Sequence, residues 1–201
     1  MENFLQHEQQ LILEGFAPVA GVDEVGRGPF AGPVLACALI LPEGLIIDGV
    51  NDSKKISPAK RERLAVQIKA AATAYAFGII DVPTIERVNI LQATMLAMAQ
   101  AVENLPTKPG AVLIDGTHAP AISCKAVCLP QGDSRSHLIA AASILAKVER
   151  DNLMANLHET YPQYGFEKHK GYGTPAHIAA IREHGLCPQH RASFCRKFAQ
   201  Q

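Results

Sequence analysis

The sequence lacks a net charge, a paired set of cysteines and any long apolar run. Its 19 lysines and arginines balance 19 aspartates and glutamates, so nothing in the total charge demands a nucleic-acid partner. The five cysteines are odd in number and include no CxxC pair, which argues against a disulfide framework and against a zinc ribbon. They are expected to be reduced thiols, as in a cytoplasmic protein.

No membrane partner is expected either. The longest apolar stretch, residues 34–47, is broken at Pro42, Glu43 and Gly44, well short of the roughly 20 residues that a transmembrane helix needs. The opening MENFLQHEQQ has no basic stretch followed by an apolar one, so a signal peptide is not predicted. With 201 residues, 48% of them hydrophobic, the chain is expected to form one globular domain, with room for a small appendage.

Strand and helix signals alternate through most of the chain, which predicts an α/β domain. The glycine-rich segment GRGPFAGP separates two apolar runs and predicts a hairpin. Ser57 followed by Pro58 is typical of a helix start, and Gly185 of a helix end. The expected strands are 19–25, 34–41, 77–82, 110–115 and 122–129, and the expected helices are 57–72, 89–104, 134–153 and 174–184.

The periodicity changes near Tyr161, where proline and glycine become frequent. We therefore predict an α/β core over residues 1–155 and a small helical segment over residues 156–201. A basic end beside an acidic centre suits a polyanion held near bound cations, although an ordinary solvated helical surface gives the same pattern. The basic residues of this end are Lys168, Lys170, Arg182, Arg191, Arg196 and Lys197.

Four carboxylates occur at the ends of predicted elements. Asp23 and Glu24 stand where the first strand meets its glycine turn, Asp115 ends a buried strand, and Asp133 lies at a helix start. Carboxylates gathered at one sheet rim repel one another unless a metal ion neutralises them, and oxygen-only ligands favour Mg²⁺ or Mn²⁺. Each also has a structural interpretation, as a helix N-terminal charge, a turn former or part of a solvated loop.

Asp23 and Glu24 raise a stereochemical question, because neighbours in a regular strand point to opposite faces of the sheet. Either the strand breaks at this point, or only one of the two side chains reaches a common site directly. The sequence leaves both arrangements open.

Seven segments carry a resemblance that covers almost everything from residue 15 to residue 198. In order they are GVDEVGRGPFAGPV, NDSKKIS, NILQATMLAM, LIDG, QGDSRSHLIAAASILAKVERD, HKGYGT and HRASF. Together they resemble bacterial ribonuclease HII. The resemblance implies a ribonuclease H-like mixed sheet flanked by helices, followed by a short helical C-terminal piece. It places the metal-binding carboxylates of the family at Asp23, Glu24, Asp115 and Asp133.

The same resemblance implies contacts with the substrate. Gly26, Arg27 and Gly28 would read the minor groove where ribose meets deoxyribose, since glycine allows close backbone approach and the 2′-hydroxyl distinguishes RNA from DNA. Tyr172 would lie against the sugar beyond this junction. The alternatives are a tight hairpin turn and an amphipathic surface tyrosine. Further candidates for contacts with the nucleic-acid backbone, any of which could instead be an ordinary solvated side chain, are Asn51, Lys54, Ser143 and Lys147.

The sequence departs from the family pattern at Gln131, where a lysine is usual before Gly-Asp, and at His137-Leu138. Neither change removes a metal ligand. Loss of the lysine removes a positive charge near Asp133, which bears on how strongly phosphate is held there. No dedicated general base is evident, and His169 in HKGYGT is a lone histidine of the kind that is more often structural than catalytic.

The resemblance implies an endonuclease that cleaves the RNA strand of RNA/DNA hybrids and cuts 5′ of single ribonucleotides in duplex DNA. Two Mg²⁺ or Mn²⁺ ions would assist attack by water, leaving 5′-phosphate and 3′-hydroxyl ends. A cytoplasmic monomer is expected. The alternatives are a type III ribonuclease H, which the absence of an extra N-terminal domain disfavours, a binding protein that has lost catalysis, and a two-metal phosphatase acting on small molecules.

Overall fold

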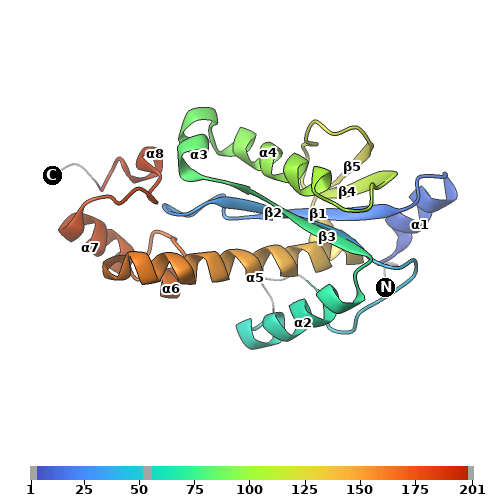
Figure 1. Cartoon of the computed structure of the whole chain (residues 1–201), viewed down its shortest axis with the longest axis horizontal. Coiled ribbons are helices and arrows are strands. Elements are labelled where there is room, and N and C mark those ends of the chain that lie inside the picture. The colour runs from blue at the N-terminus through green and yellow to red at the C-terminus, as the bar shows by residue number, and fades with distance from the viewer. Residues whose placement is uncertain (1–3, 52–55, 199–201) are drawn as a thin grey trace.

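A five-stranded mixed sheet forms the centre of this computed structural model, which describes residues 4–51 and 56–198 (Figure 1). The strand order is β3-β2-β1-β4-β5. Strands β3, β2 and β1 are antiparallel, whereas β1, β4 and β5 run parallel. The strands span Val19–Val25 (β1), Val34–Ile40 (β2), Ala74–Ile80 (β3), Ala111–Asp115 (β4) and Lys125–Leu129 (β5). The predicted α/β sheet and its hairpin of β1 and β2 are therefore confirmed.

Helices cover both faces of this sheet (Figure 1). Helices α2 and α5 pack on one face with residues of α1, while α3 and α4 pack on the other. None of the described helices is long and apolar enough to cross a membrane. The α-helices span Gln6–Leu13 (α1), Pro58–Ala71 (α2), Val82–Val88 (α3), Ile90–Glu103 (α4), His137–Thr160 (α5), Phe166–His169 (α6), Pro175–His184 (α7) and Ala192–Cys195 (α8), and the short 3₁₀ turns are Gly132–Ser134 (η2) and Pro162–Tyr164 (η3).

The C-terminal helices α6, α7 and α8 gather at one end of the sheet, beside the turn between β1 and β2 (Figure 1). A backbone bridge between Ala31 and His190 joins this turn to the C-terminal segment. Helix α5 runs through residue 155 without a break, so the division predicted there falls inside a continuous helix. The prediction of a short C-terminal helical piece is confirmed, including its helix ending before Gly185.

Three predicted elements differ from the structure, and one helix was not predicted. The strand expected over residues 122–129 begins only at Lys125. The strand expected over residues 77–82 is Ala74–Ile80, because it pairs with β2 along its whole length from Ile40 opposite Ala74. Residues 82–88 form the unpredicted helix α3, which begins where Asp81 accepts the Thr84 N–H. Helix α5 begins at His137 rather than Ser134, because residues 132–134 form a tighter turn, and it continues seven residues past the predicted end.

Two glycines let helices lie close against the sheet. A Cβ atom added at Gly78 in β3 would overlap the carbonyl oxygen of Ala97 in α4. One added at Gly21 in β1 would overlap the backbone of Leu138 in α5. The atoms met are backbone atoms, which cannot rotate away as a side chain does. The spacing between helix and sheet on both faces therefore depends on a missing methyl group.

We predict that Gly78→Ala lowers the free energy of unfolding by about 1–3 kcal/mol or more, because α4 must shift from the sheet. Urea denaturation measures the loss. Gly44→Ala is the matched control, since Gly44 has φ +73° but no atom within 4 Å of an added Cβ, and it should cost about 1 kcal/mol through backbone strain. Equal stability of wild type and Gly78→Ala would show that the contact relaxes without cost.

Candidate active site

Asp23, Asp115 and Asp133 lie at or just after the carboxyl ends of β1, β4 and β5. Val22 pairs with Ile114 in the parallel register of β1 and β4, so Asp23 and Asp115 are the next residues on adjacent strands. The carboxyl ends of parallel strands open on one rim of a sheet, where α/β proteins gather functional groups. Asp133 reaches the same region from η2, four residues after the end of β5. Three of the four predicted ligands therefore come from this rim.

Asp23 is a buried carboxylate, with 5% of its surface exposed. It accepts hydrogen bonds from the backbone N–H of Glu24, at 2.8 Å, and from the Ser143 hydroxyl of α5. Burial raises the pKa of Asp23 well above its usual range, and the charges of Glu24 and Asp115 raise it further. The ionised form is therefore costly unless a cation lies nearby.

Glu24 projects from the opposite face of β1. The strand remains regular through Val25, with Asp23 opposite Cys37 and Glu24 opposite Ala36, so the neighbours alternate as in any strand. Burial raises the pKa of Glu24, while the Arg27 guanidinium, 3.4 Å away, lowers it and Asp115 raises it. Glu24 therefore lies on the other side of β1 from Asp23, although the charge of Asp115 raises the pKa of both carboxylates.

Asp115 and Asp133 are linked through the backbone of η2. The Gly132 N–H donates to Oδ1 of Asp115 at 2.6 Å, and Asp133 follows directly and is 8% exposed. Gln131, at the position where the family has lysine, is exposed and adopts φ +57°, which turns the chain into η2. Asp133 is thus buried and Asp115 half-buried, and the Gly132 N–H connects the two.

The donor set of this rim fits a hard divalent cation. All four side chains offer only carboxylate oxygen, which suits Mg²⁺ or Mn²⁺. Within residues 4–51 and 56–198, no three His, Cys, Asp or Glu side chains are gathered closely enough to form a complete metal site. Burial and mutual repulsion raise the pKa of both Asp23 and Glu24, and a bound cation would relieve both effects.

The turn after β1 holds three other predicted residues, of which Gly26 is buried. Gly26 adopts φ +93°, a conformation that favours glycine, while Arg27 and Gly28 are exposed. A Cβ atom added at Gly28 would lie 3.8 Å from Cε1 of Tyr172, whose surface is 44% exposed. The structure thus brings the GRG turn and Tyr172, which are separated by more than 140 residues, into one surface.

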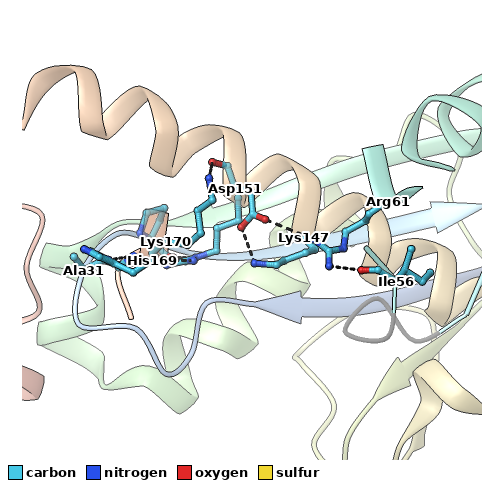
Figure 2. Close-up of polar contacts among 10 residues, drawn as sticks. Ala31, Ile56, Arg61, Lys147, Asp151, His169 and Lys170 are labelled. Atoms are coloured by element: carbon cyan, nitrogen blue, oxygen red, sulfur yellow. Dashed lines mark hydrogen bonds and ion pairs between the residues drawn. The ribbon is translucent and has the colours of Figure 1, made fainter. Parts of the chain in front are cut away.

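The remaining predicted contacts occupy different surroundings. Ser143 is buried and bonds to Asp23, behind the carboxylates. Lys147 donates to Asp151 at 2.7 Å, and Figure 2 shows Asp151 paired with both Lys147 and Arg61. Asn51 is exposed, and Lys54 lies outside the described residues. A role for these four in binding nucleic acid stays a prediction.

Two buried arginines donate hydrogen bonds to the turn between β1 and β2 from the interior of the protein. Neither was predicted from the sequence to have this role. Arg150 and Arg191 are each 0% exposed. Arg150 donates to the carbonyl oxygens of Ala31, Pro33 and Lys170 at 3.0–3.2 Å. The sequence carried one signal for Arg150, since it falls on the helical stripe of Ala142, Ala146 and Met154, all of them buried. Arg191 had been counted among the basic residues of the tail, and its burial removes it from that surface.

A chain of neutral histidines supports Tyr172. The Cys187 N–H donates to Nδ1 of His190 at 2.9 Å, so this nitrogen carries no proton and Nε2 of His190 does. Nε2 of His190 lies 3.0 Å from Nε2 of His177, which therefore accepts. Nδ1 of His177 in turn donates to the Tyr172 carbonyl at 2.9 Å. The proton positions follow from these partners because each nitrogen has one compatible role.

His169 stacks on His177, with ring centroids 4.3 Å apart. Its Nδ1 accepts the Gly171 N–H at 3.2 Å, and its Nε2 donates to the Tyr164 carbonyl at 2.7 Å. Burial lowers the pKa of His169, consistent with the neutral ring that these bonds require. His169 thus stabilises the backbone around the HKGYGT segment by hydrogen bonding, which agrees with its interpretation as a structural histidine.

The sheet order, its helical layers and the acidic rim define a ribonuclease H-like fold. The crystal structure of ribonuclease H2 from Pyrococcus horikoshii OT3 matches 90% of this chain and 96% of that one, with a TM-score of 0.75 and 26% sequence identity. Bst-RNase HIII, solved in complex with Mn²⁺, matches 83% of this chain and 62% of that one, with a TM-score of 0.66 and 23% identity, and shares the fold.

Residues 20–197 match the family model described as Ribonuclease HII. The ribonuclease HII of Ruminiclostridium cellulolyticum is 52% identical over 200 residues, which cover all of this chain and 78% of that protein. The chain therefore belongs to the ribonuclease HII family. It is a ribonuclease H, an endonuclease that cleaves RNA in RNA/DNA hybrids.

We predict that acidification destabilises the protein through His190. Burial, and the neighbouring His177 next, lower the pKa of His190 from 6.5 to about 4, so the unfolded chain takes up a proton that the folded chain refuses. Neutral His190 therefore contributes its full share to the free energy of unfolding above pH 6.5. This contribution declines as the pH falls toward 4, and the total loss is up to about 3 kcal/mol.

Urea denaturation at pH 7.5, 6 and 5 measures this dependence. His190→Phe is the control, because phenylalanine keeps a ring against Tyr164 and Phe166 but has no group to titrate. Its unfolding free energy should fall less steeply with acid than that of the wild type. Parallel pH dependences would mean that His190 contributes none of the effect.

Proposed function

We propose that the protein cuts duplex DNA on the 5′ side of single ribonucleotides, in addition to cleaving RNA/DNA hybrids. The observation that carries this proposal is the placement of the acidic rim at the end of β1, directly before an exposed turn that meets Tyr172. A cleavage centre and a surface able to contact one sugar are thereby joined by the few residues between Asp23 and Gly28. Such a short connection suits an enzyme that selects a single nucleotide beside the bond it breaks.

In the proposed reaction, Asp23, Glu24, Asp115 and Asp133 hold divalent cations at the rim. Two bound Mg²⁺ or Mn²⁺ ions would supply a metal-activated water and stabilise the leaving oxygen, giving 5′-phosphate and 3′-hydroxyl ends. Asp23 and Asp115 supply oxygen ligands from adjacent strands, and Ser143 fixes the Asp23 carboxylate by hydrogen bonding. Arg27, paired with Glu24, offers a cationic group beside the same rim.

The GRG turn and Tyr172 are proposed to recognise the junction. The exposed backbone at Arg27 and Gly28 can approach a 2′-hydroxyl, the group that distinguishes ribose from deoxyribose. The exposed ring of Tyr172 offers a flat apolar surface for the adjoining sugar. Residues 156–201 are proposed to act as the substrate-binding segment of a monomer, with Asn51, Lys54 and Lys147 as further backbone contacts.

We predict that Asp23→Asn and Asp133→Asn each lower single-turnover cleavage of a duplex with one ribonucleotide by at least about 100-fold. Duplex affinity should change little, because binding relies on contacts along the nucleic-acid backbone. Cleavage rates are measured in Mg²⁺ and in Mn²⁺, and a gel-shift titration measures the affinity for the duplex. Asp48→Asn, an exposed aspartate that ends no strand, is the matched control and should cut at the wild-type rate. Wild-type cleavage by either site variant would remove that residue from the metal site.

Tyr172 allows a separate test of substrate recognition. If its ring packs on the sugar, Tyr172→Phe keeps most of the activity, while Tyr172→Ala loses on the order of 100-fold because the sugar is no longer held in register for attack. Single-turnover rates on the single-ribonucleotide duplex measure both, with circular dichroism as the folding check. Equal losses in Phe and Ala would assign the contact to the hydroxyl group, and two wild-type rates would place Tyr172 outside the interface.

A further inference from the structure

Arg191 binds the GRG turn through backbone carbonyls alone. Its Nη2 donates to the carbonyl oxygens of Gly26, at 2.6 Å, and Gly32, at 2.8 Å, and its Nη1 donates to that of Arg27 at 2.9 Å. Charge-assisted hydrogen bonds of this kind are stronger than those between neutral groups. One side chain therefore fixes both ends of a turn that follows a strand of the active-site rim.

These bonds also fix which way the turn presents its donors. The peptide bonds after Gly26 and Arg27 are trans, because the one cis bond among the described residues is Ala17-Pro18. In a trans peptide the N–H points opposite to the C=O. With the carbonyls of Gly26 and Arg27 turned inward to Arg191, the N–H groups of Arg27 and Gly28 point away from it, toward the exposed side of the turn.

His190, the neighbouring residue, supports the opposite side of the same surface. Through His177 it reaches the Tyr172 carbonyl, in bonds of 3.0 and 2.9 Å. The backbone around the pair is tied to the turn as well, since the Arg191 N–H donates to Phe30 at 2.7 Å. Two consecutive residues thus hold Gly26–Gly28 from one side and Tyr172 from the other.

We propose that His190 and Arg191 are positioning residues that hold the GRG turn and Tyr172 in register, and so determine the preference for a single ribonucleotide. The proposal rests on the proposed reading of the junction by these groups. Neither residue touches substrate, since both are buried. In a duplex with one ribonucleotide, only one position of the turn brings it against a 2′-hydroxyl. A hybrid offers a 2′-hydroxyl at every nucleotide of its RNA strand. Loss of register therefore harms cleavage of the single-ribonucleotide duplex more than cleavage of the hybrid.

The test compares single-turnover cleavage, with kcat and KM, on two duplexes of equal length, one with a single ribonucleotide and one with an all-RNA strand. The readout is the ratio of the two rates, because general destabilisation lowers both rates together. In Arg191→Lys one ammonium group replaces a planar fork and cannot reach all three carbonyls. In His190→Phe the ring packing is kept and both hydrogen bonds are lost. Each ratio should fall at least about 10-fold, mainly through kcat on the single-ribonucleotide duplex.

Ser193→Ala is the matched control. Ser193 bonds to Glu86 of α3, so this change loosens the same C-terminal segment without touching the turn, and its ratio should equal that of the wild type. Circular dichroism confirms folding, and His190→Phe decides the question if Arg191→Lys does not fold. Ratios within twofold of wild type in the folded variants would overturn the proposal, as would an equal fall in Ser193→Ala.

Gly28→Val separates this proposal from the function on which it rests. A bulky side chain at Gly28 meets the Tyr172 ring and alters the junction surface directly. If Gly28→Val loses the preference while His190→Phe and Arg191→Lys keep it, the junction reading stands and the positioning role falls. If wild type and Gly28→Val have the same ratio of rates, the GRG turn does not read the junction. The positioning role of His190 and Arg191 is then overturned as well.

Discussion

Two buried guanidinium groups, bonded to backbone carbonyls, are the constraint on which the active end of the molecule depends. Removing a charged group from water costs several kcal/mol, and only well-placed hydrogen bonds offset that cost. Arg150 and Arg191 are fully buried and converge on carbonyls of the turn between β1 and β2. If the turn opened, Arg191 would lose its acceptors and Arg150 would keep only the Lys170 carbonyl. The turn and the two arginines therefore stabilise one another.

The carboxyl end of β1 and the turn that follows it carry groups of opposite charge. Asp23 and Glu24 end the strand as carboxylates whose pKa values are raised by burial, a site that favours a bound cation. Three residues later the backbone carbonyls turn toward Arg191, whose pKa burial lowers to about 10, so that it remains charged at neutral pH. A cation-binding rim and an anchored turn are thus adjacent without a direct ion pair between Asp23 and Arg191 among the described residues.

The sequence predicted the elements whose signals are local and missed those that depend on distant partners. Strand β1 and helix α7 carry clear patterns and end where predicted. The strand expected to begin at residue 77 begins instead at Ala74, because its position depends on pairing with β2. The four carboxylates could be proposed from motif resemblance. The burial of Arg191 could not, since a basic residue near the end of a chain has the same local pattern whether it is solvated or bonded to carbonyls 159 residues away.

Helix α5 joins the acidic rim to the turn between β1 and β2. Ser143, behind Asp23, and Arg150, behind the GRG turn, are seven residues apart, and two turns of helix place them on one face about 10 Å apart. The distance between the acidic rim and the turn is therefore fixed by a single rigid element. The C-terminal segment joins the same element through the Lys170 carbonyl, which accepts from Arg150. If the enzyme cuts at a fixed offset from one sugar, as proposed, rigidity along α5 matters more than rigidity within either surface alone.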